Sequence, residues 1–208
     1  KTIQTEVFRL PTTCFAEETG SFTNSSRVIS WKERAVEPPG EAKTDSEIMA
    51  RLFVKLRAAY AKDGGTLPEP VAKLSWPYLN ANVPNAGELL REINGKALAD
   101  VLSPPDPKDP KAPPQVLVKA GDQLPGFAML RDDGSTACGN WIYAGCWSQA
   151  GNLTARRDTA DPTGLGVFPG WGFSWPANRR ILYNRASADK DGKPWDASRR
   201  YIAWNGKA

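Results

Sequence analysis

The part of the sequence best equipped for chemistry is a short polar stretch, residues 15–27. It gathers hydroxyl, amide, carboxylate and guanidinium groups around one glycine, Gly20. Glycine permits a positive φ or a close approach of the backbone to a ligand. Hydroxyl and amide side chains both donate and accept hydrogen bonds. The stretch can therefore hold a polar ligand, and its uncharged donors and acceptors are Ser21, Thr23, Asn24, Ser25 and Ser26.

The same residues also fit a purely structural interpretation. One strand can end at residues 10–11 and a second can begin at residues 28–29, with the polar residues as the turn of a hairpin. Trp31 would then close the second strand. Residue chemistry leaves both interpretations open.

The composition is that of a globular chain. It has 208 residues, 40% of them hydrophobic and 24% charged, with a mean hydropathy of −0.48. That length suffices for one domain or for one and a half, and no apolar run reaches the length of a membrane span. The 27 basic and 23 acidic residues are mixed along the chain, so we expect no nucleic-acid partner. The sequence begins without methionine in strand-like residues 3–8, which we interpret as the interior of a longer polypeptide.

The sequence has no histidine and three cysteines, Cys14, Cys138 and Cys146. These spacings match no zinc motif, and a nucleophile activated by histidine cannot form. Cys138 and Cys146 could bridge across a hairpin, although we favour free, partly buried thiols. We expect Cys14 to lie at a strand end with its side chain pointing into the packing.

Local signals predict two helices. Thr44 is typical of a helix N-cap, apolar residues recur at mostly helical spacing up to residue 62, and Gly64-Gly65 stops the pattern. A shorter helix is predicted over residues 85–93, ended by Asn94-Gly95.

The second half of the chain reads as strands and loops. Residues 103–114 hold six prolines and predict an extended surface connection. Strands are predicted at residues 116–118 and 140–145, with a turn at residues 132–134. From Gly151 onward glycine, proline and tryptophan dominate, which predicts a long irregular segment.

The amino-acid sequence of residues 15–27 resembles that of a known family. Phe-Ala-Glu, Gly-Ser, Phe, Thr-Asn and a following Arg resemble the late part of the catalytic subunit of periplasmic formate dehydrogenases, which are molybdopterin oxidoreductases. Residues 178–196 are equally similar to that subunit. Shorter similar blocks lie at residues 130–134, 140–145 and 155–162, so the resemblance covers nearly the whole chain.

The resemblance implies an α+β fold: a partial α/β molybdopterin oxidoreductase domain with a long irregular Trp/Gly/Pro-rich extension. We expect residues 1–102 to be the remainder of a cofactor-proximal α/β domain and residues 103–115 to be the proline-rich connection. Residues 116–208 would be a mixed strand and loop extension that packs on the rest of the subunit.

The resemblance also implies a function. The family oxidises formate to carbon dioxide and passes two electrons to iron–sulfur clusters, using a bis-molybdopterin guanine dinucleotide with tungsten or molybdenum. In this chain the cofactor-binding residues would be Glu17, Gly20, Ser21, Thr23, Asn24 and Arg27.

Catalytic and metal-binding residues are not expected here. The family's metal ligand is a cysteine or selenocysteine followed by histidine, preceded by the motif for a 4Fe-4S cluster, and this chain lacks both. The implied partners are the remainder of the catalytic subunit, an iron–sulfur electron-transfer subunit and, as a further candidate, a cytochrome subunit. The implied location is periplasmic. Tungsten and molybdenum cannot be told apart from these residues.

A second hypothesis is a secreted binding module for carbohydrate or peptide. Its platform would consist of Trp147, Trp171, Trp175 and Trp195, and the Asn24-Ser25-Ser26 and Asn152-Leu153-Thr154 triplets would be glycosylation acceptors. The absence of regularly spaced strands after residue 151 disfavours it.

Overall fold

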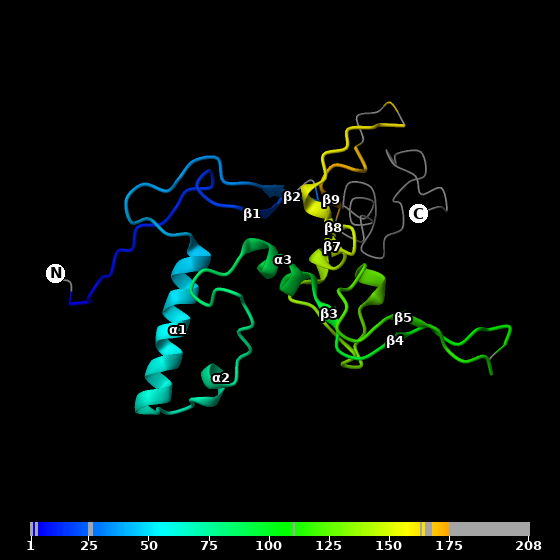
Figure 1. Ribbon diagram of the computed structural model, residues 1–208, viewed down its shortest axis with the longest axis horizontal. Helices are drawn as coiled ribbons and strands as arrows, with labels where there is room; N and C mark the ends of the chain where they lie inside the picture. The colour runs from blue at the N-terminus through cyan, green and yellow to red at the C-terminus, as the bar shows by residue number, and fades with distance from the viewer. Residues whose placement is uncertain are drawn as a thin grey trace.

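The computed structural model describes residues 2, 4–24, 27–109, 111–162, 164 and 168–174. Within them, helices and small antiparallel sheets follow one another along the chain (Figure 1). This mixture confirms the predicted α+β class. Much of the Trp/Gly/Pro-rich extension, including the block at residues 178–196, lies outside the described residues.

The helices and strands are short except for the first helix. The helices are α1 (Asp45–Asp63), α2 (Glu69–Ala72) and α3 (Ala86–Asn94), with single 3-10 turns η1 (Phe127–Met129), η2 (Trp141–Tyr143) and η3 (Leu153–Ala155). One antiparallel sheet has the order β1 (Gly20–Thr23), β2 (Val28–Lys32), β9 (Phe173–Ser174). The other antiparallel pairs are β3 (Lys96–Ala97) with β6 (Thr136–Ala137), β4 (Val101–Leu102) with β5 (Val116–Val118), and β7 (Trp147–Ser148) with β8 (Gly151–Asn152).

Local capping forms the two predicted helices. The Thr44 hydroxyl accepts a hydrogen bond from the backbone of Glu47 at 3.1 Å, which starts α1, and Gly64 ends it. Asn85 forms a complete capping box with Glu88 at the start of α3. Both predicted helices are confirmed, each to within one residue at either end.

The proline-rich segment forms the loop that joins β4 to β5. Figure 1 shows this loop projecting beyond the two strands, and its described residues are mostly exposed. The predicted surface connection is confirmed. Because β4 and β5 pair, the segments on either side of the loop lie side by side. The proposed domain boundaries at residues 103–115 stay a prediction.

Three local predictions were wrong. Residues 4–11 form no strand, and Val7 and Phe8 are exposed. The first strand is β1, within the stretch that we assigned to a turn, because its partner β2 selects it through pairing. Residues 141–143 form a 3-10 turn instead of a strand, since the Asn140 side chain caps the Ile142 backbone at 3.2 Å. Cys14 is exposed, because it lies in a turn.

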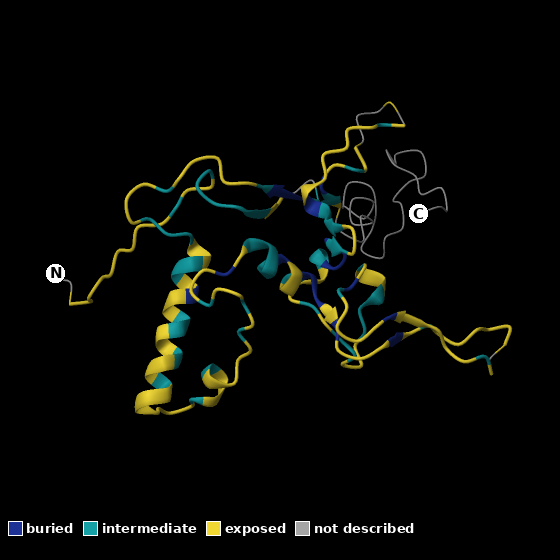
Figure 2. Ribbon diagram, in the orientation of Figure 1, coloured by how far each residue is buried: buried dark blue, intermediate teal, exposed yellow. Residues whose placement is uncertain are grey.

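The described residues bury few large apolar side chains. One cluster joins Trp31, Leu90 and Cys146, and a second joins Ala97, Val101 and Val118. Figure 2 shows these buried positions along β2, α3 and the segments beside them, whereas α1 is largely exposed or half-buried. The core therefore holds the hairpin of β1 and β2 against α3, and the rest of the described chain extends from it.

Cys146 is expected to be the least reactive thiol. Burial, with a smaller contribution from Cys138, raises the pKa of Cys146 to about 12 from the ordinary 9.0. A maleimide at about pH 8 should label exposed Cys14 first and Cys146 only after unfolding in urea, because the thiolate is the nucleophile. Because folding raises this pKa, the folded chain keeps the thiol proton that the unfolded chain loses. The free energy of unfolding should therefore fall as the pH rises from 9.0 towards 12. Equal labelling rates for Cys14 and Cys146 in the folded chain would contradict the assignment.

Candidate functional site

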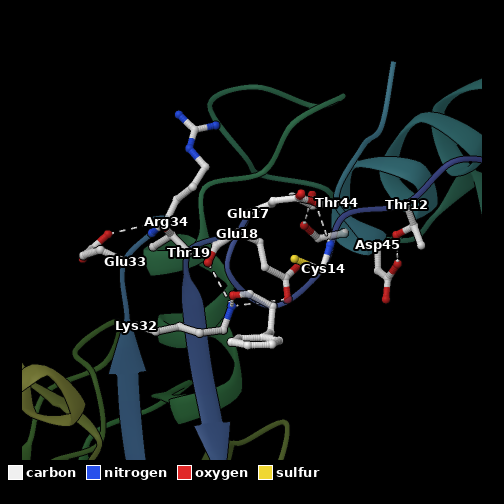
Figure 3. Close-up of polar contacts among 12 residues, drawn as sticks. Thr12, Cys14, Glu17, Glu18, Thr19, Lys32, Glu33, Arg34, Thr44 and Asp45 are labelled. Atoms are coloured by element: carbon white, nitrogen blue, oxygen red, sulfur yellow. Dashed lines mark hydrogen bonds and ion pairs between the residues drawn. The ribbon is translucent and has the colours of Figure 1, made fainter. Parts of the chain in front are cut away.

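The polar stretch begins with a loop, residues 14–19, whose backbone is bound by a lysine of strand β2. The ammonium of Lys32 on β2 donates to the carbonyls of Phe15 at 2.7 Å and Glu18 at 2.9 Å (Figure 3). It also pairs with the Glu18 carboxylate at 3.4 Å. A partly buried cation that binds two carbonyls fixes the backbone of the loop, because each bond is assisted by charge.

The segment after β2 forms further hydrogen bonds with the same loop. The carbonyl of Ala16 accepts from the backbone N–H of Ala35 at 2.9 Å. The hydroxyl of Thr19 donates to Glu33 at 3.1 Å and accepts from the Arg34 backbone at 3.0 Å (Figure 3). The loop is therefore an ordered structure, and its shape is set by residues 32–36.

Glu17 closes the turn within this loop. Its carboxylate accepts from the Cys14 backbone N–H at 2.9 Å, and its own N–H donates to the Cys14 carbonyl at 3.0 Å. Just before the turn, the Thr12 hydroxyl donates to Asp45 at 2.5 Å and ties the chain to the start of α1. Glu17 also borders a hollow of about 360 Å³ between this loop and the starts of α1 and α3.

The middle of the polar stretch is β1, an edge strand of the described sheet. Thr23 lies opposite Ile29 and Ser21 opposite Trp31. The Asn24 backbone N–H donates to the Val28 carbonyl at 3.4 Å, so these two residues form a hydrogen-bonded pair. Hydrogen-bonded and non-hydrogen-bonded pairs alternate along an antiparallel ladder. The backbone N–H and C=O groups of Ser21 and Thr23 therefore face away from β2.

The side chains of β1 have different surroundings. The hydroxyls of Thr23 and Tyr143 share a hydrogen bond of 2.7 Å, so Thr23 also braces the hairpin against η2. Gly20 has no positive φ, and a Cβ built on it would meet nothing within 4 Å. The expected backbone freedom of Gly20 is therefore not used within the described fold, and its open flank leaves room for another group.

Asn24 and Arg27 form the turn between β1 and β2. The Arg27 N–H donates to the Asn24 carbonyl at 3.0 Å, and Arg27 has a positive φ of 65°. Among the described residues of this stretch, the positive φ thus belongs to Arg27 and not to Gly20. Since β1 spans roughly 10 Å at the usual strand rise, Glu17 lies at one end of the strand and the turn at the other. The six predicted residues are spread from the loop along β1 to the turn and do not converge on a point.

Sequence reasoning missed the residues that hold this strand. Lys32 and Tyr143 are not polar-loop residues, and their contacts depend on pairing and on packing of distant segments. The only sequence signal was the position of Lys32 directly after Trp31 at the strand end.

A second hollow, of about 530 Å³, lies beside α3 and away from β1. Burial first, and then the hydrogen bond to Glu92, raise the pKa of Tyr78 well above its usual range. A tyrosine held in its protonated form donates to the carboxylate and is a poor acid for catalysis.

Neither a metal cluster nor a membrane helix occurs within the described part of the chain. No group of three or more histidine, cysteine, aspartate or glutamate residues there could hold a metal ion. None of the helices described is both long enough and apolar enough to cross a membrane.

Comparison with known proteins finds a family model that is similar to the polar stretch. Residues 8–55 match the family model described as molybdopterin oxidoreductase. We call residues 8–55 the molybdopterin oxidoreductase segment, after the model that they match. The molybdopterin oxidoreductase segment includes all six predicted site residues, together with the loop, β1, β2 and the first half of α1.

The whole chain is similar to formate dehydrogenase subunits. It is 52% identical over 98% of its length to the formate dehydrogenase-O major subunit of Escherichia coli (strain K12). It is 50% identical over 99% of its length to the formate dehydrogenase major subunit of Haemophilus influenzae (strain ATCC 51907 / DSM 11121 / KW20 / Rd), and 41% identical to formate dehydrogenase 2 subunit alpha (cytochrome c-553) of Nitratidesulfovibrio vulgaris. The chain spans about 19% of the length of each. The resemblance noted from the sequence is therefore confirmed, and it concerns a portion of these subunits.

Proposed function

We propose that this chain is part of the catalytic subunit of a formate dehydrogenase. The observation that carries the proposal is the 50–52% identity to two formate dehydrogenase major subunits across nearly the whole chain. The reaction would be oxidation of formate to carbon dioxide, with two electrons leaving to iron–sulfur clusters. In this arrangement the rest of the catalytic subunit supplies the metal ligand and the cluster.

The cofactor would be a molybdopterin guanine dinucleotide that carries molybdenum or tungsten and supplies the redox chemistry when bound. The structure of β1 fits such a group. The outward backbone groups of Ser21 and Thr23 on an edge strand suit a heterocycle or an anionic phosphate, and the open flank of Gly20 leaves room for it. Asn24 and Arg27 at the turn would add an amide and a cation, while Glu17 and Lys32 hold the loop.

The proposal extends to location and partners. The enzyme would act in the periplasm with an iron–sulfur electron-transfer subunit, and a cytochrome subunit is a further candidate. Fractionation of cells should recover the chain with periplasmic markers, and purification under mild conditions should recover an iron–sulfur protein with it. Recovery with cytoplasmic markers would overturn the location alone.

The direct test is to purify the assembly that contains this chain and to measure three quantities: dye reduction that depends on formate, bound molybdenum or tungsten, and bound pterin. All three are expected together. An assembly with neither metal nor pterin would overturn the proposed function.

Replacing Asn24 by alanine should lower cofactor occupancy in the assembled enzyme. Loss of a hydrogen bond to a charged group weakens binding by about tenfold. The readouts are metal and pterin content per subunit, and α1 should stay folded because it is capped independently by Thr44. The matched control is Asn82→Ala, at an exposed loop position between α2 and α3. Equal cofactor content in both variants would remove Asn24 from the site.

The isolated chain should show neither formate oxidation nor metal binding. The reason is chemical, because the ligand pair of the family is not in this sequence. A Cys14→Ser variant of the assembled enzyme should keep its full rate, because Cys14 is exposed and contributes only its backbone to the loop. Lost turnover with normal cofactor content in this variant would mean that the chemistry reaches Cys14.

The binding-module hypothesis is not favoured. Trp147 lies under the guanidinium of Arg91, 4.4 Å from its ring centroid, and Trp171 lies under Arg157 at 5.2 Å. Each guanidinium occupies one face of its ring, although Trp171 stays 40% exposed, and the identity to formate dehydrogenase subunits over nearly the whole chain is the stronger ground against a binding module. Trp175 and Trp195 lie outside the described residues.

A further inference from the structure

Helix α1 carries apolar side chains on two adjoining sides. On the first side Ala50 is buried, and the Phe53 ring packs on Trp76 with centroids 4.3 Å apart. Arg57 on the same side donates to the carbonyl of Val71 at 3.3 Å and holds α2 against the helix. This side of α1 is thus satisfied within the chain.

The second side is exposed. Met49, Leu52 and Leu56, which we call the α1 stripe, expose 63%, 58% and 44% of their surface. At about 100° per residue, positions separated by three and four residues form one line along a helix. Figure 2 shows α1 largely exposed along this length. Exposed Ala59 extends the stripe by almost one further turn.

Several charged residues of α1 lie on a third side, whereas Asp45 and Asp63, at the two ends of the helix, fall in line with the stripe. Arg51, Lys55 and Lys62 fall outside the stripe by the same helical count. Apolar residues therefore occupy about two thirds of the circumference of α1. A helix that faces water on one side has a single apolar stripe, whereas a helix with apolar residues over most of its surface is buried between two partners.

The length of the relatives indicates which partner covers the α1 stripe. The chain corresponds to about 19% of the formate dehydrogenase major subunits that it matches, so about four fifths of those polypeptides have no counterpart here. Between Met49 and Leu56 the stripe is apolar, and such a face resembles the inside of a domain or a permanent interface more than a transient contact.

We propose that the α1 stripe is an internal packing surface covered by the remainder of the same catalytic subunit. The proposal rests on the proposed function, because it takes this chain to be part of that subunit. The iron–sulfur subunit and a second copy of this chain are the competing occupants, and the experiment below separates them.

The experiment compares two single-cysteine labelling sites in the assembled enzyme. Leu52→Cys places a thiol in the stripe, and Ala58→Cys places one at an exposed position on the charged side of the same helix. Maleimide labelling is followed for each site by peptide mass spectrometry, in a Cys14→Ser background. Labelling of the cysteine at position 52 is expected to be at least about tenfold slower than at position 58 in the assembly, and equally fast in the isolated chain.

A measurement on the unmodified protein covers the case in which Leu52→Cys fails to assemble. Met49 should be oxidised by peroxide at least about tenfold more slowly in the assembled enzyme than in the isolated chain, because its thioether is then covered. Met129, half-buried against the core of this chain, is the internal reference and should change little.

Three results would overturn the proposal. The stripe could be labelled as fast as position 58 in the assembly, or it could become accessible when the iron–sulfur subunit alone is removed. It could also be protected in the isolated chain in proportion to concentration, which would indicate a second copy. None of these readouts depends on activity. A protected stripe in an assembly without metal or pterin would leave this inference standing and overturn the proposed function.

Discussion

Replacing Gly95 by alanine is expected to prevent the middle of the chain from folding. Gly95 ends α3 with a φ of 86°, and a Cβ built there would lie 2.1 Å from the Ala137 carbonyl oxygen and 2.6 Å from the Cys138 Cα. Both contacts are with backbone, which cannot rotate away as a side chain can. The left-handed conformation adds about 1–2 kcal/mol. With overpacking included, we expect a loss of about 3–5 kcal/mol, measured by urea unfolding.

Gly134→Ala is the matched control for this substitution. Gly134 has nearly the same φ, 84°, but a Cβ there meets nothing within 4 Å. Its alanine variant should lose only the conformational term, about 1–2 kcal/mol. The difference between the two variants therefore measures the cost of separating α3 from the strand β6. Equal losses would show that close contact of Gly95 with β6 contributes nothing.

Asn94→Ala should be the second most damaging substitution. Asn94 is fully buried and joins three segments that are far apart in the sequence. Its amide N–H groups donate to Gly95, Gln123 and Leu124, and its oxygen accepts from Gly145 at 2.8 Å and Trp147 at 3.1 Å. Removing the side chain leaves several buried backbone groups unpaired, so a loss of about 3–5 kcal/mol is expected in the same urea experiment.

Two further variants test this role of Asn94. Asn140→Ala removes an exposed asparagine that caps only the Ile142 backbone, and it should cost about 1 kcal/mol. Asn94→Asp keeps the acceptor oxygen but replaces the amide nitrogen by a second oxygen. That oxygen would face the three acceptor groups of Gly95, Gln123 and Leu124. The pKa of the new carboxyl should be raised on folding, so this variant should be more stable at about pH 5 than at about pH 8. A variant whose stability does not change with pH would mean that water reaches this position.

The sequence by itself determined the features that depend on neighbouring residues. Thr44 and Asn85 start helices because each side chain caps a backbone N–H two or three residues later. Gly95 ends α3 because the backbone there has a positive φ of 86°, which glycine adopts readily. The order of residue types in the polar stretch also sufficed to identify the molybdopterin oxidoreductase segment, because family resemblance is a property of sequence.

Only the tertiary structure decided the features that depend on distant partners. Residues 20–23 became a strand, and not a turn, because β2 pairs with them. Asn94 was visible in the sequence only as a helix stop, whereas its amide reaches loops 29 to 53 residues away. The periodicity of α1 predicted a helix with an apolar face, but only the packing of Phe53 on Trp76 showed that the α1 stripe is a second and uncovered face. Local hydrogen bonds can be read from spacing, whereas pairing and burial exist only once the chain is folded.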